Sequence, residues 1–512
     1  MTSFMQRHGV GVLKIFRKSL KYMTAGIAVT VVMYMMSLIC ERVAVAADLP
    51  SPAAAKQAFV WNQDAYWKSL EKMYADLIAD GCGEVVEDVS ARLNDLKSLL
   101  ARISAKKLSP DAPEFDELEK AMFETAPLVS ACNTGVSEYL SLASDMRTVV
   151  KRQSEKWDMQ SDVTRITLYR LLYGSRGAVE EIMTQAPASA FSVLTPGTDE
   201  PSAAPEAIVR DVRLHSGDIL VSRGGAPTSA LIARGSDYPG NFSHIAFVYV
   251  DPASKEAKIV EAHIEIGVVV STVEQYLRDK KLRVMLLRPR ADLPQIQKDP
   301  LLPHKAAEYA YKRATENHVP YDFAMDYQDH SRLFCSEVAS EAYERFGVHL
   351  WAGISHISSP GLRMWLSAFG VEHFETQEPS DLEYDPQLRV VAEWRDPAAL
   401  KQDRIDNAVT EVMLEGAEKG EDLAYPEILY PLAGVVKGYS TVLNWFGKAG
   451  PIPEGMSVSA ALRSQEYMKR HTALAERLSI EAEQFRKDKG YEAPYWQLVL
   501  MARAAKEKQG DN

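Results

Sequence analysis

Residues 243–250, which read SHIAFVYV, decide the fold, because six consecutive apolar or aromatic residues follow Ser243 and His244. A short apolar run rich in β-branched and aromatic side chains is typical of a buried strand. Working outward, we expect further strands at 219–222, 257–264, 268–271 and 282–287, with a hairpin about Gly267. Helices are expected at 304–317 and 334–346. This pattern predicts an α+β domain over residues 211–395, in which a small antiparallel sheet packs on helices.

On both sides of this domain the apolar period becomes helical. Residues 86–103 carry apolar side chains at steps of three and four, which predicts one buried face of a helix. Similar stripes recur through residues 48–194, and we expect a bundle of four or five helices there. Residues 396–512 return to helical patterning, and the Pro- and Gly-containing segment 195–210 has the composition of a linker.

The composition, with 46% hydrophobic and 25% charged residues, is that of an ordinary globular protein. The formal net charge is −12, and without residues 1–47 the balance is 52 basic against 69 acidic side chains. Phosphate binding needs clustered Lys and Arg, so we expect no nucleic-acid partner.

Residues 1–47 have the pattern of an export signal. Five basic residues precede an almost uncharged run of 19 residues, 22–40, and the small-residue stretch 44–47 follows. The run is long enough to span a bilayer, so a membrane anchor is the alternative to a cleaved signal peptide. Either interpretation predicts an exported body, in the periplasm or anchored at the membrane and facing outward.

The cysteines fit an oxidising compartment. Cys40 lies inside the signal, which leaves Cys82, Cys132 and Cys335. Cys82 and Cys132 fall in one predicted helical domain, and we expect them to form a disulfide worth about 4 kcal/mol on the loop-entropy model. Cys335 is then a free thiol.

Cys335 lies in the stretch LFCSEV, residues 333–338, at the opening of a predicted helix. The backbone N–H groups and the positive dipole end of a helix start stabilise a thiolate, which favours a nucleophile. The structural alternative is a buried, inert cysteine. A nucleophile needs a base, usually His, and a third group that orients the base.

The candidate base is His244, a titratable ring near the start of an otherwise apolar strand. On the neighbouring strand Glu261 and His263 share one face, so Glu261 is the candidate orienting group and His263 its rival. A core histidine and a solvated edge glutamate are the structural alternatives. These alternatives become less favoured because a spare cysteine, a strand histidine and a strand glutamate occur together in one β-rich domain.

The order His244, Glu261, Cys335, with Gly217-Asp218-Ile219 ahead and Pro320-Tyr321-Asp322 between, gives a resemblance to a known family. Over residues 215–347 the chain resembles the circularly permuted papain-fold hydrolases of the YaeF/YiiX group, relatives of the NlpC-type peptidoglycan peptidases and of lecithin–retinol acyltransferase. The matching pieces read HSGDILVSRG, SHIAFVYV, IVEAHIEIGVVVSTVEQYL, VPYDF and FCSEVA. The resemblance implies Cys335 as nucleophile, His244 as base and Glu261 as orienting residue.

Other chemistry has little support in the sequence. No H-E-x-x-H or C-x-x-C motif occurs, so we expect neither a metal nor another cofactor. Tyr321 is a candidate for lining the cleft or donating to the oxyanion, and packing is its structural alternative.

Three functions remain open. The first is an exported cysteine hydrolase that cleaves an amide, most plausibly in cell-wall peptide. The second is a lipid acyl hydrolase or acyltransferase with the same triad. The third is a binding or scaffold protein with an inert papain-like domain, whose protein partners the sequence does not identify.

Overall fold

The computed structural model describes residues 58–83 and 85–510. The expected signal or anchor, residues 1–47, lies outside the described residues, as does Cys40. In the part of the chain that is described, no helix is both long and apolar enough to cross a bilayer.

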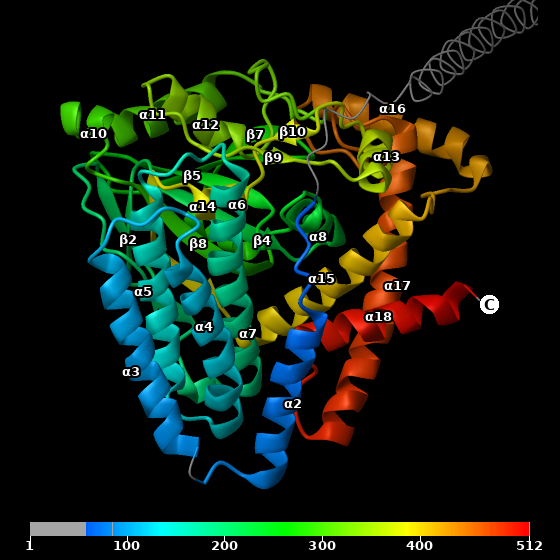
Figure 1. The fold of residues 1–512 in the computed structure, drawn as a ribbon. Helices are drawn as coiled ribbons and strands as arrows, with labels where there is room; N and C mark the ends of the chain where they lie inside the picture. The colour runs from blue at the N-terminus through cyan, green and yellow to red at the C-terminus, as the bar shows by residue number, and fades with distance from the viewer. Residues whose placement is uncertain (1–57, 84, 511–512) are drawn as a thin grey trace, which may run out of the picture.

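A seven-stranded antiparallel sheet forms the centre of the molecule (Figure 1). Its order is β1-β11-β8-β4-β5-β6-β7. The strands in that order are Leu194–Pro196, Leu388–Arg395, Lys281–Pro289, Ile219–Gly224, His244–Val250, Ala257–His263 and Gly267–Thr272. The central strands are apolar on both faces, as is typical of a sheet that is covered on both sides.

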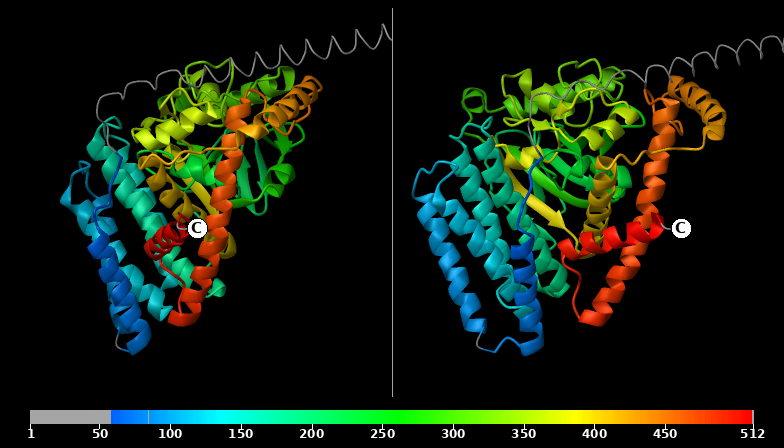
Figure 2. Two further views of the ribbon diagram at one scale, coloured as in Figure 1. Left: turned by 90° about the vertical axis from the view of Figure 1, so that its right-hand side faces the viewer. Right: turned by 45° about the vertical axis from the view of Figure 1, so that its right-hand side comes forward.

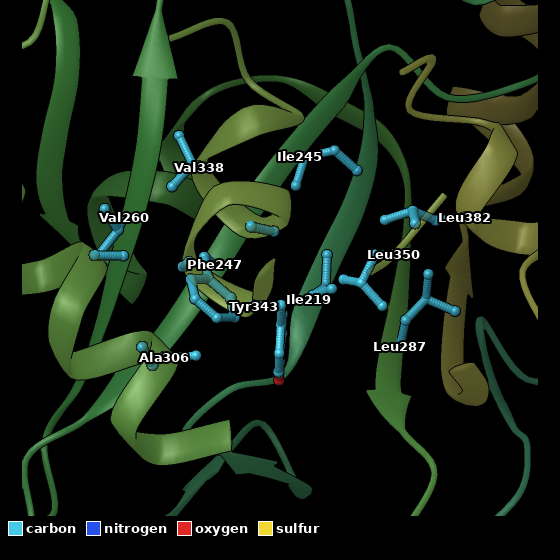
Figure 3. Packing of buried hydrophobic residues seen from close by; sticks show 14 of the residues in the cluster. Ile219, Ile245, Phe247, Val260, Leu287, Ala306, Val338, Tyr343, Leu350 and Leu382 are labelled. Carbon is cyan, nitrogen blue, oxygen red and sulfur yellow. The ribbon is translucent and has the colours of Figure 1, made fainter. Parts of the chain in front are cut away.

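One face of the sheet packs against α11 (Leu302–Glu316) and α12 (Glu337–Glu344). Figure 3 shows Ile245, Phe247 and Val260 of the strands beside Val338 and Tyr343 of α12. The opposite face is covered by α9 (Val273–Arg278) and by the hairpin of β2 (Glu206–Val209) and β3 (Val212–His215). The domain predicted around residues 243–250 is therefore an α+β domain with a buried antiparallel sheet.

The chain before the sheet forms a helical bundle. Its members are α2 (Asp64–Asp80), α3 (Val85–Ser104), α4 (Pro113–Cys132), α5 (Val136–Ser154), α6 (Asp162–Leu168), the π-helical turn Tyr169–Tyr173, and α7 (Gly174–Gln185). A disulfide joins Cys82 to Cys132 and links the turn before α3 to the end of α4.

The chain after the sheet is helical as well: α15 (Pro397–Glu418), α16 (Tyr430–Trp445), α17 (Val458–Lys489) and α18 (Tyr495–Gly510). Figure 2 shows α17 running along one side of the molecule, with the N-terminal bundle on the other side. Shorter elements complete the chain: the 3-10 turns Ala188–Ala190 and Glu427–Leu429, the helices α8 (Pro227–Arg234), α10 (Pro294–Lys298), α13 (Pro360–Phe369) and α14 (Asp381–Tyr384), and the strand pair β9 (Ser355–His356) and β10 (Glu375–Thr376).

The segment 195–210 differs from the expected linker. Its first residues belong to β1, which pairs with β11 at the sheet edge, and its last residues form β2. Thr198 and Gly197 continue the backbone pairing with residues 390 and 391. Backbone hydrogen bonds to a strand almost 200 residues away hold the start of the segment in place.

Candidate active site

Three polar side chains meet where β5 starts and β6 ends. His244 is the first residue of β5, and its Nε2 lies 2.8 Å from Oε2 of Glu261 on β6. The Nε2 atom of His263 lies 3.3 Å from the other oxygen of Glu261. Ser271 of β7 also donates its hydroxyl to that oxygen, at 3.0 Å. Glu261 therefore lies between two imidazoles, and its side chain is 2% exposed.

The two histidines respond oppositely to this shared carboxylate. Burial lowers the pKa of His244, although its hydrogen bond to Glu261 acts in the other direction. The hydrogen bond to Glu261 raises the pKa of His263. Burial alone would raise the pKa of Glu261, but the hydrogen bonds from both histidines lower it well below its usual range. A neutral His244 beside an ionised Glu261 follows, which is the protonation state that a general base requires.

Cys335 lies in the turn just before α12 and is 6% exposed. Ile245, the residue after His244, lies in the same core as Cys335, and its backbone N–H lowers the pKa of the thiol. The β5–β6 ladder runs only from Phe247–Val260 to Val250–Ala257, so the start of β5 is open to this interaction. Since Nε2 of His244 is taken by Glu261, Nδ1 is the ring nitrogen that does not bond Glu261.

The expected stabilisation of a thiolate by the helix start is not what the structure gives. Burial raises the pKa of Cys335 to about 11, and this outweighs the lowering by the Ile245 and Ser336 N–H groups. The helix also begins at Glu337, two residues later than the thiol. Cys335 is a neutral thiol at neutral pH, so a base must remove its proton during attack.

Tyr321 packs beside this thiol. It contacts the core that contains Cys335, and its ring centroid lies 5.1 Å from that of Phe323. Burial raises the pKa of Tyr321 well above its usual value, and the negative charge of the Cys335 thiolate adds to the rise. Gly267, with φ of +74°, allows the β6–β7 turn to meet the carbonyl of Val319 just before this segment.

Sequence reasoning missed three polar groups near the predicted site residues Glu261 and Cys335. Ser271 continues the alternating face of β7 and was detectable from that period. Glu337 hydrogen-bonds the N–H of Phe334 at 2.8 Å, and burial raises its pKa to about 9. Glu378 is 5% exposed, burial raises its pKa well above the usual range, and its charge acts on Cys335. Glu378 comes from a loop 43 positions beyond Cys335, and no local pattern points to it.

Within residues 58–83 and 85–510, no group of three or more His, Cys, Asp or Glu side chains is placed to hold a metal ion. Glu261, His244 and His263 instead satisfy one another by hydrogen bonds.

Comparison with known proteins finds one family model that matches the part of the chain that holds this site. Residues 213–392 match the family model described as permuted papain-like amidase enzyme, YaeF/YiiX, C92 family. The matched segment contains His244, Glu261, Tyr321 and Cys335 and spans β3 to β11. The helical regions on either side lie outside it.

The chain is also similar to the crystal structure of metalloprotein yiiX from Escherichia coli O157:H7, at 18% sequence identity and a TM-score of 0.29. The similarity covers 35% of this chain and 98% of that chain. No match was found among the curated proteins.

Proposed function

We propose that this permuted papain-like amidase domain is exported and cleaves an amide bond through Cys335, His244 and Glu261. The match of residues 213–392 to a family of permuted papain-like amidases supports a cysteine hydrolase. The observation that supports the assignment of roles is the 2.8 Å bond between His244 and Glu261, together with the position of the next residue, Ile245, in the core that contains Cys335. In this proposal Glu261 holds Nε2 of His244, and Nδ1 serves the thiol of Cys335.

The proposed reaction starts from a neutral pair. Nδ1 of His244 takes the proton of Cys335 as the sulfur attacks the carbonyl carbon. Backbone N–H groups in the turn before α12 hold the oxyanion. The imidazolium then gives its proton to the leaving amine, which departs and leaves a thioester on Cys335.

The thioester is resolved by water. His244 removes one proton from the water as its oxygen attacks the thioester carbon, and the carboxylic acid leaves with the C–S bond broken. The proton returns from His244 to the sulfur. Glu261 stays ionised throughout and stabilises the imidazolium at each stage.

We infer that the substrate is a peptide of the cell wall. The family description names amidases, which supports an amide rather than an ester. The basic segment and apolar run within residues 1–47 support export, and the Cys82–Cys132 disulfide suits an oxidising compartment.

The test compares substrates and variants in one assay. The chain is incubated with purified peptidoglycan and, separately, with phospholipid vesicles, and released products are identified by mass spectrometry. We expect amide cleavage products from peptidoglycan, their loss in Cys335→Ser, and a decrease of about 10²–10⁴-fold in His244→Ala. His349→Ala is the matched control, because His349 is a 71% exposed histidine of the same domain.

Other outcomes separate the alternatives. Fatty acid or transferred acyl chains from the vesicles, abolished by Cys335→Ser, would establish the lipid acyl hydrolase or acyltransferase. A Cys335→Ser chain that retains full cellular function, with no product from either substrate, would establish the binding protein.

A further inference from the structure

The helix α16 carries a continuous apolar stripe on its outward face. The stripe runs from the turn before the helix to the residue after it, at steps of four and three. Its side chains are 44% to 85% exposed: Ile428, Leu432, Val435, Tyr439, Val442 and Phe446, with the 77% exposed Trp445 beside them. Monomeric soluble proteins rarely expose contiguous apolar patches of this kind, and those that do use them for binding.

The stripe is not the face that attaches α16 to the body. Tyr430, Gly434 and Ser440 lie on the opposite side and are buried. Tyr430 forms a small core with Val458 and Leu462 of α17, and Lys437 donates to the carbonyl of Pro453. The side of the helix that packs on protein carries polar residues such as Lys437 and Ser440, and the apolar stripe faces away from it. The outward apolar side chains are therefore not explained by packing within the chain.

The charge around α16 is unlike that of the rest of the chain. From Ile428 to Pro453 there is no Asp or Glu in a protein that has 70 of them, and the two charged residues are Lys437 and Lys448. Tyr439, Trp445 and Phe446 gather toward one end of the stripe. Lys together with aromatic residues over an apolar stripe is the composition of a helix that lies in a membrane interface.

The length of chain between residues 22–40 and the first described residue is sufficient for α16 to meet a bilayer. The described chain enters the body with a bond from the N–H of Phe59 to the carbonyl of Asp237. Asp237 also bonds Ser358, next to α13, and α13 and α16 both pack on α17 (Figure 1). The 17 residues 41–57, between the expected membrane segment 22–40 and this entry point, can extend about 55–60 Å.

The same end of the molecule carries the candidate active site. Glu454, just after the acid-free segment, accepts a bond of 2.7 Å from His318. Gly455 lies against the ring of Phe323 and near the carbonyl of Tyr321. The loop between α16 and α17 is thus attached to the segment that packs beside Cys335.

We propose that α16 docks on the surface of a lipid bilayer through this stripe and holds the Cys335 site at the membrane. The docking does not depend on the proposed reaction. Its consequence for substrate does: a hydrolase held this way acts on bonds presented at the membrane surface.

The test uses Trp445 as a local reporter in the full chain, so that binding by residues 22–40 does not mask the result. Vesicles of phosphatidylcholine and phosphatidylglycerol with brominated acyl chains quench tryptophans that enter the bilayer. We expect the tryptophan fluorescence of the wild type to be quenched. Trp445→Phe should lose the part of this quenching that Trp445 contributes. The double variant Leu432→Asp, Val435→Asp removes the same part, because charged side chains there prevent insertion.

Ile480→Asp is the matched control, because Ile480 is 72% exposed on α17 and should quench like the wild type. Cys335→Ser should also quench like the wild type, which separates docking from catalysis. Equal quenching in the wild type and Trp445→Phe would overturn the proposal. If such a chain also sediments as a dimer without lipid, and the Leu432→Asp, Val435→Asp variant as a monomer, a second copy is the occupant instead.

Discussion

At the thiol of Cys335, two effects that sequence reasoning treats together act in opposite directions. Proximity to a helix start favours the thiolate, and burial disfavours it. The position in LFCSEV indicates the first effect, whereas burial depends on the core that Cys335 shares with residues distant in sequence, such as Ile245. Burial is the stronger here, and the pKa of Cys335 rises to about 11.

We therefore expect alkylation of Cys335 by iodoacetamide to accelerate as pH rises past about 8.5, the ordinary thiol pKa. The rate should still increase toward pH 11, because the thiolate fraction grows over that range. Mass spectrometry of the Cys335 peptide at a series of pH values measures this. A rate that levels off below pH 8 would mean an activated thiolate and would contradict the effect of burial.

His263 is expected to set the acidic limit of activity through Glu261. The positive charge of His263 lowers the pKa of His244, and His263 shares the carboxylate that raises it. In His263→Gln the charge is lost and Glu261 serves His244 alone. The pKa of His244 should rise, so the acidic limb of the kcat/KM profile moves to higher pH.

The profile separates this role from simple packing. A structural role for His263 would lower kcat/KM at every pH and leave the limb where it is. Glu261→Gln should shift the acidic limb in the opposite direction to His263→Gln. It removes the carboxylate that both histidines share, so the pKa of His244 should fall further and the limb should move to lower pH. The plateau of kcat/KM should also be lower. Both profiles are measured on the substrate that the wild type cleaves.

At the scale of elements, local sequence patterns predicted most strands of the central sheet. The five strands expected between residues 219 and 287 correspond to β4 through β8 and differ by at most two residues at either end. Period-two patterning also placed Glu261 and His263 on one face, as observed. The strands β1 and β11 were not predicted, because β1 has three residues and its pairing partner lies far along the chain. Pairing of that kind depends on tertiary structure and leaves little local signal.

The disulfide should stabilise the N-terminal bundle. Cys82 and Cys132 close a loop with a sequence separation of 50 residues. Replacing both by Ala should lower the free energy of unfolding of the bundle by about 4 kcal/mol, since the unfolded chain regains that loop entropy. Thermal unfolding followed by circular dichroism, with and without a reductant, measures the loss. The reductant should have no effect on the Ala variant, and a shift there would point to another cause.

At the scale of the whole molecule, buried ion pairs join the bundle to the sheet and to the C-terminal helices. Arg147 of α5 and Arg176 of α7 both pair with Glu393 of β11. Arg283 of β8 pairs with Glu180 of α7 and with Asp403 of α15. These partners are more than 100 residues apart in sequence. The sequence showed helical flanks but gave no sign of this attachment, because a lone Arg or Glu in a helix looks like a solvated face.

Glu393 is the centre of this attachment, with a fully buried side chain that accepts a 2.8 Å bond from Arg147. Glu393→Gln leaves Arg147 buried without its counter-charge, whereas Arg176 keeps its ion pair with Glu383. The loss should lower the free energy of unfolding by about 3–5 kcal/mol. Glu138→Gln is the control: Glu138 pairs with Lys97 on the surface, where both are about half exposed, and its loss should be at most about 1 kcal/mol. Urea unfolding measures both.

The contribution of Glu393 to the free energy of unfolding should depend on pH. Pairing with Arg176, Arg395 and Arg147 lowers the pKa of Glu393 well below its usual value, although burial opposes this. Its contribution to stability is therefore complete above the unfolded-state pKa of about 4.3, and is lost as pH falls from there toward the folded-state pKa. The difference between wild type and Glu393→Gln should be constant from pH 6 to 8 and shrink in acid. A difference that grows in acid would mean that Glu393 is buried in its neutral form, and the bundle would then be held to the sheet by packing rather than by charge.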